Sequence, residues 1–146
     1  IKALEPKVSY LLRPSLQPTD TSSPSAPPPT SVIFCIDVSS SMQTKSGNRT
    51  RLQAISSAVL SQLSALRSSS PSTLITIITF GSQVLLHPPN GSPIVIPTTL
   101  FKSLDRLVNF GKEHAKKTKG VGIEEAWDSW ENVVRNGLKC GGCTPL

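Results

Sequence analysis

Two short apolar runs, separated by a longer amphipathic stretch, dominate the first half of the chain. Residues 32–36 and residues 74–80 are runs rich in β-branched and aromatic side chains. Such runs are typical of strands buried on both faces of a parallel sheet. Between them, residues 50–67 have apolar side chains at steps of three and four, which predicts a helix with one stripe facing a sheet. The residues of this stripe are Leu52, Ile55, Val59, Leu63 and Leu66.

The second half predicts a hairpin followed by two helices. Residues 84–86 and 94–96 are short apolar runs around a turn rich in Pro and Gly, and the prolines favour a sheet edge. Thr98 or Thr99 is predicted to cap the next helix. Its apolar face would consist of Leu100, Leu104, Leu107 and Val108. The last helix, over residues 122–136, has the stripe Ile123, Ala126, Trp127, Trp130 and Val134, whose tryptophans we interpret as core.

This order of elements predicts an α/β fold. We expect a Rossmann-like, mostly parallel sheet that is flanked by helices and has an antiparallel edge hairpin. Residues 14–30 are mainly Pro, Ser and Thr and are expected to form a linker or surface loop. Residues 1–13 contain an apolar segment that would be extended, either as an edge strand or as the end of a preceding domain. Residues 31–146 would then form the domain.

Composition narrows the class of protein. The 146-residue chain has no apolar run long enough to span a bilayer. Its three cysteines cannot all pair, and Cys35 lies in the first apolar run, where a thiol is expected to behave as a small buried hydrophobe. We therefore expect an intracellular protein. Because the chain begins with Ile1, we also expect it to be a fragment.

Candidate chemistry follows the first predicted strand directly. Asp37, Ser39 and Ser41 are spaced two residues apart. In an extended strand end, residues at this spacing share a face, and ligands of open parallel sheets bind outside the carboxyl ends of the strands. One carboxylate and two hydroxyls are oxygen ligands of the kind that Mg²⁺ or Mn²⁺ prefers.

An Asp-x-Ser-x-Ser sequence after an apolar strand resembles the first metal-binding loop of von Willebrand factor A (VWA) domains, the metal-ion-dependent adhesion site. Phe80-Gly81-Ser82 after the second strand is similar to the family pattern as well. The resemblance implies a VWA-like domain truncated at its C-terminus, because the Asp of the family's third loop would follow a later strand. It also implies Mg²⁺ or Mn²⁺ as cofactor and a protein partner that supplies an Asp or Glu to the metal.

The end of the chain allows three interpretations. Cys140 and Cys143 form a Cys-x-x-Cys pair, but they lack the strand-then-helix setting of a redox motif or a second pair of zinc ligands. The same residues could be a plain turn. In the family interpretation, Gly-Gly-Cys-Thr-Pro-Leu resembles the second metal loop, with Thr144 as the ligand. A competing alignment on residues 120–126 places Val121, which has no side-chain oxygen, at the threonine position.

We therefore expect a metal-dependent protein-interaction module rather than an enzyme. No His accompanies Ser39 or Ser41 in the motif, and a Gly-x-Ser-x-Gly elbow is absent from the sequence. One alternative is a metal-independent scaffold domain in an intracellular complex. Another is a nucleic-acid-associated subunit, which the net charge of +6 permits. Nucleic acid is disfavoured because no aromatic residue is interleaved with the basic ones.

Overall fold

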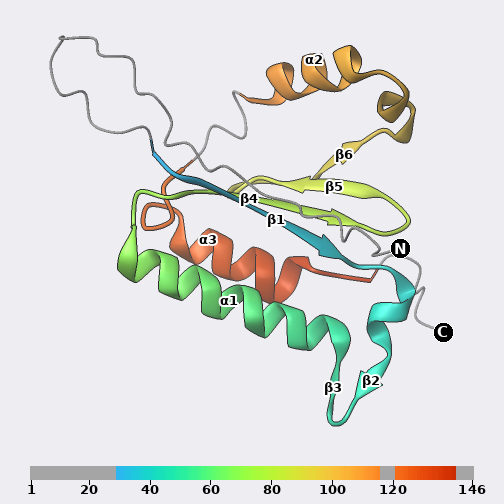
Figure 1. Ribbon diagram of the computed structural model, residues 1–146. Coiled ribbons are helices and arrows are strands. Elements are labelled where there is room, and N and C mark those ends of the chain that lie inside the picture. The colour runs from blue at the N-terminus through green and yellow to red at the C-terminus, as the bar shows by residue number, and fades with distance from the viewer. Residues whose placement is uncertain (1–28, 116–120, 141–146) are drawn as a thin grey trace, which may run out of the picture.

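The computed structural model describes residues 29–115 and 121–140. A four-stranded sheet and a short hairpin alternate with helices along the chain (Figure 1). The elements in chain order are β1 (Ser31–Asp37), the 3-10 helix η1 (Ser40–Gln43), β2 (Lys45–Ser46), β3 (Arg49–Thr50), α1 (Arg51–Ser69), β4 (Leu74–Phe80), β5 (Val84–His87), β6 (Ile94–Ile96), the 3-10 helix η2 (Thr98–Lys102), α2 (Leu104–Ala115), α3 (Trp127–Asn132) and the π-helical turn η3 (Val133–Gly137).

The main sheet has the strand order β1-β4-β5-β6 and is mixed. Strands β1 and β4 are parallel and are joined by a crossover through α1, whereas β5 is antiparallel to both β4 and β6. The prediction of a mostly parallel sheet is therefore wrong for the described strands. The connections after β4 and β5 are too short for a crossover, so the strand that follows each connection must run antiparallel to the strand before it. The predicted hairpin and its place at the sheet edge are confirmed.

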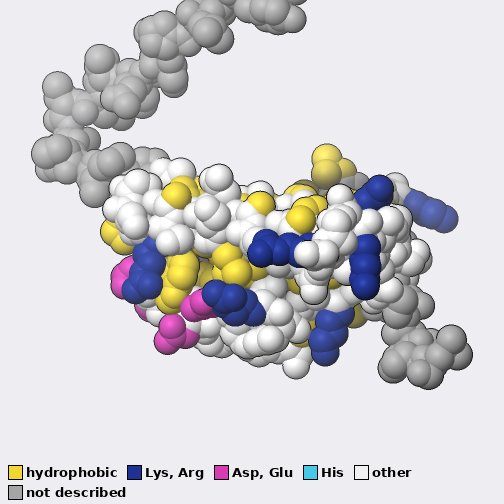
Figure 2. All heavy atoms as spheres, turned by 90° about the horizontal axis from the view of Figure 1, so that it is seen from below, with side chains coloured by type: hydrophobic (Ala, Val, Ile, Leu, Met, Phe, Trp, Pro, Cys, Tyr) yellow, Lys and Arg dark blue, Asp and Glu magenta, His cyan; other side chains and the backbone are white. Residues whose placement is uncertain are grey.

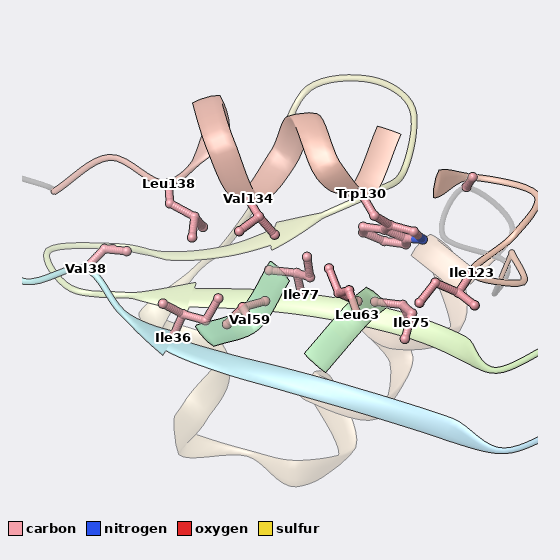
Figure 3. Packing of buried hydrophobic residues seen from close by; sticks show 11 residues of the cluster. Ile36, Val38, Val59, Leu63, Ile75, Ile77, Ile123, Trp130, Val134 and Leu138 are labelled. Atoms are coloured by element: carbon pink, nitrogen blue, oxygen red, sulfur yellow. The ribbon is translucent and has the colours of Figure 1, made fainter. Parts of the chain in front are cut away.

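Helices α1 and α3 cover the same face of the sheet and enclose the core (Figure 1). Helix α1 begins with a capping box, in which Thr50 and Gln53 exchange side-chain and backbone hydrogen bonds. Its predicted stripe faces the core, where Leu63 is fully buried. Figure 3 shows Trp130 and Val134 on the helical side, near Ile77 of β4. Since Trp130 is only 1% exposed, its interpretation as a core residue is confirmed.

The opposite face of β1 corrects a prediction. Val32, Phe34 and Ile36 point to the core, but Ile33 is 61% exposed and Cys35 is also exposed. The first strand is therefore not buried on both faces, and Cys35 is not a buried thiol. The reason is that α1 and α3 lie on one side of the sheet, while α2 lies near β6 on the other side (Figure 1).

Both later helices begin after their predicted starts. Ser103 has an extended backbone that separates η2 from α2, so Thr98 and Thr99 do not cap α2. The apolar stripe of α2 is poorly covered, since Leu104 is 75% exposed.

Helix α3 starts late because the preceding backbone is tied to β4. Gly122 forms a bridge with Leu74, and the N–H of Ile123 donates to Thr73 O over 2.9 Å. None of the helices in the described parts of the chain combines the length and apolar content needed to cross a membrane.

Candidate metal centre

The loop that follows β1 brings the three predicted oxygen donors together. The backbone N–H of Ser39 donates to Asp37 Oδ1 over 2.8 Å, and the hydroxyl oxygens of Ser39 and Ser41 are 3.0 Å apart. The predicted route to this grouping was different, because Ser41 lies in η1 rather than in an extended strand end. A 3-10 turn therefore brings the oxygen donors together, whereas an extended segment was expected to do so.

Two buried side chains hold this loop against the core. Val38 and Met42 are buried, while Ser39 is half-buried and Ser41 is exposed between them. The N–H of Val38 donates to Phe80 O over 2.8 Å, and that of Met42 donates to Ser39 O over 3.0 Å. Ser39 occupies the N-cap position of η1, yet its side chain makes no capping bond. Its hydroxyl is thus left facing that of Ser41.

Gly81 has a positioning role that the sequence pattern alone did not explain. A Cβ on Gly81 would lie 3.2 Å from the backbone N of Ser39 and 3.2 Å from the backbone O of Val38. Such contacts are tighter than ordinary van der Waals packing, so the absence of a side chain lets the end of β4 approach the loop. The Phe80-Gly81-Ser82 match was the available signal, but only the strand pairing reveals what the glycine contacts.

The electrostatics of the loop favour an ionised Asp37. A hydrogen bond from the backbone N–H of Ser39, and a second from its hydroxyl, hold the pKa of Asp37 below its ordinary value of 3.8. Within the described residues, no three His, Cys, Asp or Glu side chains are grouped so that they could hold a metal ion. A metal at this loop would therefore depend on hydroxyl oxygens beside a single carboxylate.

The donor set fits a small divalent ion. Adjacent oxygen ligands of an octahedral Mg²⁺, each about 2.1 Å from the ion, lie about 3 Å from one another. The hydroxyl oxygens of Ser39 and Ser41 already have a separation of 3.0 Å. Carboxylate and hydroxyl oxygens are hard donors, which favours Mg²⁺ or Mn²⁺ over softer metals.

The fourth predicted ligand, Thr144, lies outside the described residues, as does Cys143. The competing alignment can be placed in the fold, however. Gly122 bridges Leu74 at the start of β4, whereas Asp37 pairs with Phe80 at the end of the same strand. The segment with Val121 and Gly122 is thus at the end of the sheet opposite to Asp37, which argues against that alignment.

Comparison with known proteins agrees with this architecture. The model of the von Willebrand factor type A domain family matches residues 32–133, a range that contains the whole Asp37–Ser39–Ser41 loop. The chain therefore belongs to the VWA family, whose members generally serve as protein-protein interaction modules. No curated protein matches the chain.

Proposed function

We propose that this VWA domain is a divalent-metal-dependent interaction module that recognises an acidic residue of a protein partner. The observation that carries the proposal is the pair of serine hydroxyls 3.0 Å apart, next to a carboxylate whose pKa is lowered, at the carboxyl end of β1. This is the position at which open α/β sheets bind ligands. The parallel β1 and β4 pair with its crossover helix supports the Rossmann-like type for the whole domain.

Asp37, Ser39, Ser41 and Thr144 would hold Mg²⁺ or Mn²⁺ in this proposal. The bound ion would supply positive charge that an incoming Asp or Glu can neutralise. Asp37 is the acidic member of the set, so a site built from it and hydroxyls keeps a net positive charge for the partner's carboxylate. The partially exposed position of Ser39 and the exposed position of Ser41 suit recognition at the surface.

We further propose that the domain is not catalytic. The hydroxyls of Ser39 and Ser41 bond each other, and the two histidines contact other groups, with His87 at Thr79 and His114 at Phe110 O. Neither serine hydroxyl has a described contact with a histidine, the usual general base of a nucleophilic serine, and that of Ser39 instead donates to the carboxylate of Asp37. The free thiol of Cys35 supports a reducing, intracellular location as part of the proposal.

Metal titration of the full-length protein tests the proposal. Isothermal titration calorimetry with Mg²⁺ and Mn²⁺ should show saturable binding that Asp37→Ala weakens by about 100-fold or more, because losing even an outer partner of a metal site costs about 10- to 100-fold. Asp105→Ala is the matched control, since Asp105 is an exposed acid in the first turn of α2. Unchanged Mn²⁺ binding by Asp37→Ala would overturn the proposal.

The alternatives are separated by partner capture. If the partner is retained after chelation with EDTA, the domain is a metal-independent scaffold. If capture requires Mg²⁺ and is lost in Asp37→Ala, the metal-dependent module is supported.

A further inference from the structure

A basic hairpin lies between the candidate metal loop and the first long helix. Strands β2 and β3 form a two-stranded antiparallel sheet in which Ser46 pairs with Arg49. Gly47, with a φ of 67°, allows the tight turn between them. Lys45, Arg49 and Arg51, named here the hairpin cations, are all exposed.

Hydrogen bonds connect this hairpin to the loop of Asp37. The N–H of Thr44 donates to Ser41 O over 3.2 Å, and the N–H of Arg51 donates to Thr44 O over 3.1 Å. The backbone at the hairpin cations is therefore coupled to the backbone of η1, which carries Ser41. Figure 1 shows β2 and β3 extending from the end of β1 where η1 begins.

The hairpin cations have no acidic partner in the described structure. The two salt bridges formed by the residues described join Arg67 to Glu124 and Arg135 to Glu131, at other places on the surface. Figure 2 shows Lys and Arg side chains reaching the end that carries β2 and β3, with Asp and Glu only toward the opposite end of this face. Three positive charges on and beside this short hairpin thus have no acidic partner among the described residues.

The location of Arg51 makes this arrangement unfavourable for folding. Arg51 is the first residue of α1, and the first turn of that helix contains no acidic residue. The N-terminus of a helix carries partial positive charge, so acidic residues stabilise it and basic ones do not. Arg51 therefore gains no stabilisation from the helix dipole, whereas an acidic ligand bound beside it would be attracted by both the guanidinium and the helix terminus.

We propose that the hairpin cations and the Asp37 loop form one continuous surface for an acidic peptide segment with several carboxylates. One carboxylate would meet the metal, which rests on the proposed function above, and its neighbours along the peptide would pair with Lys45, Arg49 and Arg51. Residues 43–57 contain no aromatic side chain on which a base could stack, which favours a peptide over single-stranded nucleic acid.

The test compares two peptides and two triple variants of the full-length protein. One fluorescent peptide contains a single Glu, and the other contains the same Glu followed by three further acidic residues. Lys45→Gln/Arg49→Gln/Arg51→Gln removes the hairpin cations, and Lys102→Gln/Arg106→Gln/Lys112→Gln removes three exposed cations at η2 and α2 as the control. Fluorescence anisotropy with Mn²⁺ or with EDTA gives the affinities, and thermal melting monitored by circular dichroism checks folding.

The polyacidic peptide should bind wild-type protein about tenfold more tightly than the single-Glu peptide, the combined effect expected of three exposed ion pairs. The hairpin variant should lose this advantage and keep its affinity for the single-Glu peptide, while the control variant should retain both. High salt should abolish the advantage in the wild-type protein, because it screens exposed charges. This last measurement stays informative even if the hairpin variant folds poorly.

Other results separate the two proposals. Equal losses in the hairpin and control variants would overturn the inference, because net charge alone would then explain binding, and metal-dependent binding of the single-Glu peptide would leave the proposed function standing. Conversely, hairpin-dependent binding that EDTA does not affect would reject the proposed function and support the basic surface. A single-stranded oligonucleotide gives a further comparison. If it binds more tightly than the polyacidic peptide, and its binding depends on the hairpin cations, the choice of a peptide partner is overturned.

Discussion

The interior between the sheet and helices α1 and α3 differs from the loop after β1 in what its residues contribute to stability and to binding. Interior residues such as Leu63 and Trp130 are fully enclosed and make apolar contacts. In the loop, by contrast, Ser41 is exposed, and the buried side chains are those of Val38 and Met42. Burial of apolar area is the dominant favourable contribution to folding, so the interior should govern stability. The loop is polar and held in place at a few points, so it should govern binding with less effect on stability.

Truncation of the most enclosed residue of α1 should have the largest effect on stability. Leu63→Ala leaves a cavity among fully buried neighbours and should lower the free energy of unfolding by about 2–5 kcal/mol. Urea denaturation followed by circular dichroism measures this change. Mn²⁺ affinity of the folded fraction should stay within twofold of wild type, and a loss of Mn²⁺ binding by the folded protein would break the division between interior and loop.

Ile33→Ala is the matched control for Leu63→Ala. Ile33 is an apolar residue of β1 on the face away from α1 and α3 and is 61% exposed. Its truncation should change the free energy of unfolding by about 0.5 kcal/mol or less, as for most surface positions. A change as large as that of Leu63→Ala would show that this face contributes to folding as much as the covered one.

Gly81→Ala should affect the loop more than the interior. The new Cβ would press on the backbone of Val38 and Ser39, and relief of such crowding costs about 1–3 kcal/mol in packed sites. Displacement of Ser39 should also weaken Mn²⁺ binding, measured by calorimetry. In the control Gly111→Ala, the new Cβ meets no atom within 4 Å, so this change within α2 should stabilise the protein slightly and leave Mn²⁺ binding unchanged.

The smallest effect should come from acidification of the interior. His87 is 4% exposed, its Nε2 lies 2.9 Å from Thr79 Oγ1, and burial lowers its pKa from the ordinary 6.5. The folded protein then binds fewer protons than the unfolded chain as pH falls below 6.5, so stability should decline from pH 6.5 toward the lowered pKa and stay flat above it. Urea denaturation between pH 8 and 5 measures this contribution as the difference from His87→Gln. A difference that does not vary with pH would contradict the assignment.

The sequence predicted the interior better than its surroundings. The stripe of α1, the bounds of β4 and the burial of Trp130 were all foreseen, because apolar periodicity reflects which residues leave water. Periodicity does not say what covers an apolar surface, however. That is why β1 was expected to be buried on both faces, and why the apolar face listed for α2 did not reveal that Leu104 remains largely exposed.

The loop was predicted from its chemistry but not from its geometry. Spacing of two between Asp37, Ser39 and Ser41 suited an extended strand end, and the 3-10 turn that actually forms also brings their oxygens together. The role of Gly81 could not be predicted from the sequence, because it depends on the pairing of β4 with β1, which joins residues far apart in the chain. Residue types thus indicated the site, and tertiary contacts determine its form.

The parallel pairing of β1 with β4 also determines where the carboxylate of Asp37 points. Asp37 lies opposite Phe80, and Ile36 lies opposite Thr79. Because successive residues of a strand face opposite ways, a slip of a single residue in this pairing would turn Asp37 inward and Ile36 outward. The apolar side chains of the interior make such a slip costly. Although they contact no ligand, they therefore keep the carboxylate of Asp37 on the side of the strand away from the core.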